Sequence, residues 1–140
     1  MIKFILKCDP PITTSQEKKV AIVCGKPRFY EPKKLKEAKQ LLIKLLLNYV
    51  PQQKLEGALQ LHVIWKFPRN KSHKHNEWRT TKPDTDNLQK MLKDCMTKTN
   101  YWQDDAQVVV ERVEKLWVNN EDAGIEISIE QLDKFRKDEK

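Results

Sequence analysis

The chain has 140 residues, of which 39% are hydrophobic and 34% are charged, and its formal net charge is +7. This length predicts a single domain over residues 1–140 that has a core of its own and a charged tail over about residues 133–140. The short apolar run at the N-terminus and the absence of roughly 18 consecutive apolar residues exclude a signal peptide and a membrane span, so we expect a cytoplasmic protein without a membrane partner.

Cysteine number and charge limit the class of protein further. Cys8, Cys24 and Cys95 are odd in number and form no CxxC pair, which predicts reduced, buried thiols and no disulfide framework. The 27 Lys and Arg residues outnumber the 20 Asp and Glu residues, which fits either an ordinary basic surface or a nucleic-acid partner. Charge alone does not decide between these two.

The first part of the chain predicts two short strands. Residues 2–6 alternate in character, and Pro10-Pro11 ends this first strand. The apolar, β-branched run Val20–Cys24 predicts a second strand, and Gly25-Lys26-Pro27 predicts the turn that closes it.

A helix is expected between Pro32 and Pro51, and its apolar face is wide. The main stripe recurs at helical spacing and consists of Leu35, Ala38, Leu42, Leu45, Leu46 and Tyr49. Leu41, Ile43 and Leu47 widen this stripe. We expect the face to be buried in the core of the domain, and contact of part of it with a second subunit is the alternative.

A strand and a basic loop follow this helix. Alternation over Leu59–Trp65 predicts the strand, whereas Arg69–Lys82 has no hydrophobic period and is expected to be an exposed loop. The basic residues of the loop are Arg69, Lys71, Lys74, Arg79 and Lys82.

The second half of the chain predicts another helix and two more strands. The helix begins near Asp84–Asp86 and is expected to bury Leu88, Met91, Leu92, Cys95 and Met96. Strands are expected over residues 108–118 and, after a turn at Asn119–Gly124, at Ile125, Ile127 and Ile129. The order is roughly ββαβαββ, which predicts an α+β fold with two helices packed on a mixed or antiparallel sheet.

Acidic residues flank the second predicted helix on both sides. Asp84 and Asp86 stand at its start with Lys90 four residues later, and Asp104-Asp105 follows its end. Mg²⁺ binds oxygen ligands, usually one or two carboxylates together with water and substrate phosphate. The basic loop before Asp84 would attract that phosphate. The pattern therefore indicates a hard-cation site for phosphodiester hydrolysis, in which Lys90 stabilises developing negative charge.

A simpler interpretation competes with this site. Asp84 can be a helix N-cap, Asp86 can complement the helix dipole, and Asp86 can form a surface ion pair with Lys90. Asp104-Asp105 lacks such an explanation, because it precedes a predicted strand and does not favour strand formation. The clustering of like charges is better explained by a cation that neutralises their repulsion.

Other chemistries fit the sequence less well. His62, His73 and His75 have no Cys or Glu partner at the spacing of a zinc site, and no serine or cysteine nucleophile motif is present. Paired carboxylates can also cleave glycosides, but a basic protein with a lysine-rich loop is a poor match to a neutral sugar.

Two segments of the chain resemble the RusA family of Holliday junction resolvases. The first has the spacing D-x-D-N-x-x-K over Asp84–Lys90, and the second has W-x-D-D-x-Q-V over Trp102–Val108. The likeness is strong over about Lys82–Val113, and a looser likeness covers Pro10-Pro11 and Arg28-Phe29-Tyr30.

The resemblance implies a homodimeric endonuclease, bacterial or prophage-encoded, that uses Mg²⁺, with Mn²⁺ as a substitute. Such an enzyme binds four-way DNA junctions and nicks two strands of like polarity in DNA recombination and repair. Carried over by position, Asp84, Asp86 and Asp105 would bind the metal, Lys90 would be the catalytic lysine, and Asp104 would support them. The loop is not a close match to the family, and its five basic residues are expected to contact DNA because of their charge. A C2 dimer matches the two equivalent strands of a junction.

Three other functions stay open at this stage. One is a non-catalytic nucleic-acid-binding module, in which tryptophans stack on bases; the chain has Trp65, Trp78, Trp102 and Trp117. Another is a metal-dependent nuclease that prefers flaps, forks or RNA. The third is a structural protein that keeps the fold without activity, and the intact acidic motifs argue against it.

Overall fold

The computed structural model describes residues 1–13, 19–23, 26–30 and 32–138. The strands are β1 (Ile2–Leu6), β2 (Lys19–Val23), β3 (Lys26–Tyr30), β4 (Leu59–Pro68), β5 (Glu77–Trp78), β6 (Val108–Val118) and β7 (Gly124–Gln131). The helices are α1 (Lys33–Leu46) and α2 (Thr85–Lys98), and the short 3₁₀ turns η2 (Asp105–Gln107) and η3 (Asn120–Asp122) precede β6 and β7. The predicted α+β fold is confirmed.

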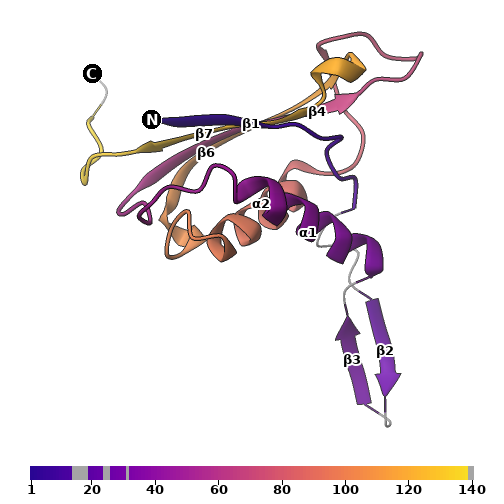
Figure 1. Cartoon of the computed structure of the whole chain (residues 1–140), viewed down its shortest axis with the longest axis horizontal. Coiled ribbons are helices and arrows are strands. Elements are labelled where there is room, and N and C mark those ends of the chain that lie inside the picture. Colours follow the sequence, from indigo (N-terminus) through magenta and orange to yellow (C-terminus); the bar gives the residue numbers. More distant parts are fainter. Residues whose placement is uncertain (14–18, 24–25, 31, 139–140) are drawn as a thin grey trace.

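Five strands form one mixed sheet in the order β1-β7-β4-β6-β5, and both helices lie on one face of it (Figure 1). Strands β4 and β6 are parallel, and the connection between them contains α2. The carboxyl ends of these two strands therefore lie at the same end of the sheet, which is where binding sites of parallel strands form. The loop after β4, the start of α2 and η3 all lie at this end.

The core lies between the two helices and the covered face of the sheet. Every second side chain of β4 is buried there, namely Leu59, Leu61, Val63, Trp65 and Phe67. Helix α2 buries the predicted set Leu88, Met91, Leu92, Cys95 and Met96. The wide apolar face of α1 is only partly core, because Leu41 is 38% exposed and Leu47 is 55% exposed.

Two short strands were not predicted. Lys26 and Pro27 belong to β3 and pair with Val23 and Ile22 of β2, so the turn predicted at Gly25-Lys26-Pro27 is wrong for its last two residues. Cys24 and Gly25 lie outside the described residues. Proline is tolerated because both strands of this two-stranded ribbon are edges. The ribbon is separate from the main sheet and extends away from the rest of the domain (Figure 1).

The second unpredicted strand, β5, lies within the segment that was expected to be a loop. Glu77 and Trp78 pair with Trp117 and Leu116 of β6. A strand of two residues leaves no hydrophobic period in the sequence, so only its long-range partner can reveal it.

Helix α1 and the thiols also refine the predictions. Helix α1 ends at Leu46, five residues before Pro51, and Tyr49 beyond it stacks on Phe4 at 4.7 Å between ring centroids.

Neither Cys8 nor Cys95 forms a disulfide. Cys95 is buried and Cys8 is half-buried, and burial together with the charge of Asp9 raises the pKa of the Cys8 thiol to about 11. Among the residues placed, no helix has the length and apolar character needed to cross a bilayer.

Candidate active site

The first turn of α2 presents two carboxylates and a lysine to solvent. Asp84 is the N-cap residue, but its side chain makes no capping hydrogen bond, and Asp86 lies in the first turn. Both residues and Lys90 are exposed. Within the described part of the chain, these three side chains make no hydrogen bond or ion pair, so the Asp86–Lys90 pair of the simpler interpretation is not formed. The carboxylate oxygens are therefore available to a cation.

Strand β6 holds the backbone just before Asp84 through Lys115. The Lys115 ammonium donates hydrogen bonds of 2.7 Å to the carbonyl oxygens of both Thr81 and Pro83. Burial and the positive charge of Arg79 lower the pKa of Lys115, and the negative charge of Asp84 opposes that shift. The ammonium thus lies within electrostatic reach of the Asp84 carboxylate. Lys115 was not among the predicted site residues, although a charged residue at an inward-facing position of a predicted strand is a usable signal.

The second acidic group is held by a capping box. The Asp104 carboxylate accepts the Ala106 N–H at 2.9 Å, and the Gln107 side-chain oxygen accepts the N–H groups of Gln103 and Asp104. Asp104 therefore caps η2, and the expectation that Asp104-Asp105 caps no helix is wrong. The Gln107 amide nitrogen also donates to the carbonyls of Leu55 and Gly57 at 3.1 Å. These bonds fix the turn that carries Asp105.

Aromatic residues before η2 anchor it to the core. Trp102 and Tyr101 are fully buried. The Trp102 indole donates to the Thr97 hydroxyl at 2.7 Å, and the Tyr101 hydroxyl donates to the Leu46 carbonyl at the end of α1. In the segment Tyr101–Gln107, the aromatic residues and the glutamine are structural, whereas the Asp105 side chain is left partly exposed.

The surroundings of Asp105 disfavour its ionised form. Burial, hydrogen bonding with Asp104, and the negative charges of Asp94 and Asp104 raise the pKa of Asp105, and the positive charge of Lys93 opposes them. A bound cation would lower that pKa again, because it stabilises the carboxylate.

The two acidic groups lie apart within one chain. Asp105 is within electrostatic reach of Asp94, and Asp94 is eight residues after Asp86, or about 12 Å along the axis of α2. The part of the chain that the structure describes contains no group of three His, Cys, Asp or Glu side chains that could hold a metal ion. Within one chain, Asp84 and Asp86 are exposed carboxylates, which are the type of ligand that Mg²⁺ binds together with water and phosphate.

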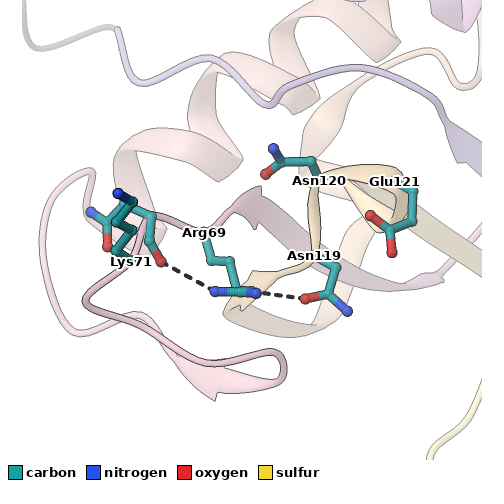
Figure 2. A pocket seen from close by; sticks show the side chains of 6 residues that line it. Arg69, Lys71, Asn119, Asn120 and Glu121 are labelled. Carbon is teal, nitrogen blue, oxygen red and sulfur yellow. Dashed lines mark hydrogen bonds between the residues drawn. The ribbon is translucent and has the colours of Figure 1, made fainter.

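Basic groups lie at the same end of the sheet as Asp84. The Arg69 backbone N–H donates to the carbonyl of Val118 at the end of β6. Figure 2 shows the Arg69 guanidinium in an open pocket with Lys71 on one side and Asn119 on the other. Its Nε donates to the Asn119 side chain at 2.8 Å, and Nη1 donates to the carbonyl of His73 at 3.2 Å. No carboxylate among the placed residues pairs with Arg69, so its charge remains available to an anion.

Arg79 differs from the other basic residues of the loop. Its guanidinium lies 4.3 Å from the ring centroids of both Phe67 and Trp117, and it donates twice to the Lys82 carbonyl. These contacts give Arg79 a structural role in closing the loop, and its contact with DNA stays a prediction. Lys71, Lys74 and Lys82 are exposed.

The loop histidines and the tryptophans can now be sorted. His73 stacks on Trp117 at 4.3 Å and contacts Glu77, and His75 accepts the Asn119 backbone N–H at 2.9 Å. Both histidines therefore serve the loop structure. Three tryptophans are buried, namely Trp65, Trp102 and Trp117, whereas Trp78 on β5 is 62% exposed. Of the four, Trp78 alone presents a ring that could stack on a base.

Comparison with known proteins places the chain in a family. The family described as "Endodeoxyribonuclease RusA" matches residues 9–130. A relative named "Crossover junction endodeoxyribonuclease rusA", from Lactococcus phage r1t, is 34% identical over 132 residues, which cover 93% of this chain and 98% of the relative. The chain belongs to the RusA endodeoxyribonuclease family. The resemblance seen in the two acidic motifs is thereby confirmed over nearly the whole chain.

Membership of the RusA family gives the site its chemical class, endonucleolytic cleavage of DNA. The roles of Asp84, Asp86, Lys90, Asp104 and Asp105 stay predictions. The structure contributes their setting, namely an exposed carboxylate pair at the start of α2 and a capped turn that carries Asp105.

The raised pKa of Asp105 leads to a direct test. We expect Asp94→Asn to lower the pKa of Asp105, because it removes one of the negative charges that disfavour ionisation. The measurement is an NMR pH titration of the Asp105 side-chain carboxyl in the metal-free protein. Asp133→Asn, in the exposed tail, is the matched control and should leave that pKa unchanged. An unchanged or higher pKa in Asp94→Asn would contradict the electrostatic account.

Proposed function

We propose that this protein is a Mg²⁺-dependent, structure-selective endonuclease that resolves four-way DNA junctions by paired symmetric nicks, with the whole chain acting as one domain in the bacterial cytoplasm. Support comes from its family, from the name of its phage relative and from the exposed pair Asp84 and Asp86. The pair is the observation that carries the proposal. Two carboxylates that pair with no described residue, at the same end of the sheet as a guanidinium that pairs with no described carboxylate, suit a cation and a phosphate together.

Each residue of the proposed site has a distinct task. Asp84 and Asp86 would hold the divalent ion, for which Mn²⁺ can substitute. Such an ion would supply Lewis-acid chemistry, namely polarisation of a phosphoryl oxygen and a lower pKa for a water molecule. Lys90, one turn after Asp86, stabilises charge on the scissile phosphate or the leaving oxygen. Arg69, Lys71, Lys74 and Lys82 bind the DNA backbone next to the cut.

Asp105 joins this site through a second subunit. It stands just before β6, whereas Lys115 near the end of β6 holds the segment before Asp84. In an antiparallel pair of strands, the start of one strand lies beside the end of the other. Two β6 strands paired across a two-fold axis would therefore bring the Asp105 of one subunit towards the Asp84 of its partner. The junction's two equivalent strands would then meet two equivalent composite sites.

The free edge of β6 suits that pairing. Strand β5 pairs with β6 at Leu116 and Trp117, the Arg79 N–H donates to the Lys115 carbonyl beside it, and no other described strand pairs with this edge. Val109 is 61% exposed and Val110 is 45% exposed at the uncovered end. An exposed strand edge with apolar residues, such as Val108–Val110 here, is normally paired or protected. A dimer would bury these valines and complete the ladder, which makes β6 a better interface than the scattered exposed leucines of α1.

The catalytic assignment is tested by Asp86→Asn. We expect nicking of a four-way junction with Mg²⁺ to fall by about 10³-fold, because the variant loses a charged ligand. Junction affinity should stay the same or rise, since a negative charge next to DNA is removed. Gel-shift and nicking assays measure the two quantities separately, and Asp133→Asn serves as the control for loss of one carboxylate. Full activity in Asp86→Asn would defeat the assignment.

The same assays separate the rival functions. A non-catalytic binding module would bind the junction without nicking it at any Mg²⁺ concentration. A panel of four-way, three-way, flap and linear duplex DNA would identify a nuclease of other preference.

The interface is tested by the double substitution Val109→Lys with Val110→Lys. We expect this variant to be a monomer of 16.6 kDa at micromolar concentration, where the wild type is a dimer, because two cations at a strand edge oppose pairing. Its circular dichroism spectrum should match that of the wild type, because both side chains are exposed in one subunit, while its Tm should fall by what dimerisation contributes to stability. Light scattering gives the mass. Leu41→Lys with Leu47→Lys is the matched double variant on α1. If the α1 variant is a monomer and the β6 variant is a dimer, the interface lies on α1 and the proposal for β6 is wrong.

A further inference from the structure

The Lys115 side chain, on strand β6, forms hydrogen bonds with the backbone of another segment, the one that leads into α2. It lies on the same face of the sheet as Trp65, with which it is in register, and its long side chain extends to the segment before α2. Its ammonium donates to two carbonyl oxygens two residues apart, Thr81 and Pro83, each at 2.7 Å. Backbone carbonyls carry no net charge and do not neutralise the ammonium. The positive charge of Lys115 therefore acts on Asp84, which lies within electrostatic reach.

Two of the three residues in the bonded segment, Thr81 and Lys82, are exposed, and Pro83 is buried. Asp84 is exposed and its side chain makes no capping bond, while its carbonyl accepts the Leu88 N–H at 3.1 Å. The segment is otherwise held from Arg79, whose guanidinium donates to the Lys82 carbonyl. The position of Asp84 relative to the sheet is thus set by the buried Pro83, by the first turn of α2, and by two cations, Lys115 from β6 and Arg79 from the loop.

We propose that Lys115 is a positioning residue, which holds the Thr81–Pro83 backbone so that the Asp84 carboxylate is preset for the divalent ion and the phosphate. This inference rests on the proposed function and adds a residue to it. Residues that orient a ligand are often nearly as important to a metal site as the ligand itself, and their loss typically costs 10- to 100-fold in metal affinity or activity.

Two effects of Lys115 on metal binding have opposite signs, which makes the inference testable. As a nearby positive charge, the ammonium repels a divalent cation, so its removal would tighten metal binding. As a positioning group, it reduces the freedom of Asp84, so its removal would weaken metal binding. The proposal requires the second effect to be the larger one.

The test compares Lys115→Met with Lys115→Arg and with the control Lys66→Met. Lys66 is also a lysine of the sheet with a defined partner, since it pairs with Glu126 at 3.4 Å, and among the described residues it makes no hydrogen bond to the segment before α2. The first measurement is hydrogen–deuterium exchange over residues 81–88 in the metal-free protein without DNA. The second is the Mg²⁺ concentration for half-maximal junction nicking, together with the junction Kd measured in EDTA.

We expect Lys115→Met to speed exchange in this segment and to raise the half-maximal Mg²⁺ concentration by about tenfold. Its junction Kd should stay within about twofold of the wild-type value. Lys115→Arg should restore most of both properties, because it keeps donors and charge, and Lys66→Met should match the wild type.

A half-maximal Mg²⁺ concentration that is unchanged or lower in Lys115→Met would overturn the inference, as would unchanged exchange over residues 81–88. A large loss of junction affinity in EDTA would also overturn it, because Lys115 would then be a DNA contact. Absence of nicking by the wild type would count against the proposed function instead, and the exchange measurement would still judge the positioning role.

Discussion

Strand β6 is the constraint on which the arrangement of the acidic residues depends. Asp105 stands just before its first residue, and Lys115 near its far end holds the backbone that leads to Asp84. Because an extended strand has a fixed rise of about 3.3 Å per residue, this one element keeps the two acidic groups apart within a subunit. The separation also limits the repulsion that three clustered carboxylates would suffer without a cation. Antiparallel pairing of two such strands would place the start of one strand beside the end of the other. The same strand can therefore separate the acidic residues within a subunit and bring them together between subunits.

Local pattern was sufficient for the elements that bury a regular apolar face. The five apolar positions of α2 and the alternation along β4 appear in the structure as predicted. Strand β5 could not be predicted, because its two residues depend on β6, far along the chain. The motifs located Asp84, Asp86 and Asp105, but their distances depend on the parallel pairing of β4 with β6. That pairing is a long-range property that spacing in the sequence does not carry.

The polar residues of the two motifs divide into those that build the site and those that face solvent. Gln89 is almost fully buried, where it accepts the Trp65 indole N–H at 2.8 Å and donates to Glu111 of β6 at 2.9 Å. Gln107 links η2 to the segment before β4, through the carbonyls of Leu55 and Gly57. The two glutamines thus anchor the acidic elements without using the carboxylates of Asp84, Asp86 or Asp105. Arg79 shows the same division among the basic residues, since its stacked position serves the loop.

The central claim is that Asp84 and Asp86 of one subunit act with the Asp105 of its partner, and mixing two inactive variants tests it most directly. Asp86→Asn and Asp105→Asn are each expected to be inactive as homodimers. After subunit exchange, a heterodimer contains one composite site with both substitutions and one with none. The account therefore predicts that the mixture regains nicking of one junction strand, up to about a quarter of the wild-type sites for random exchange of equal amounts. If exchange is demonstrated and no activity returns, each site lies within a single subunit and the account is contradicted.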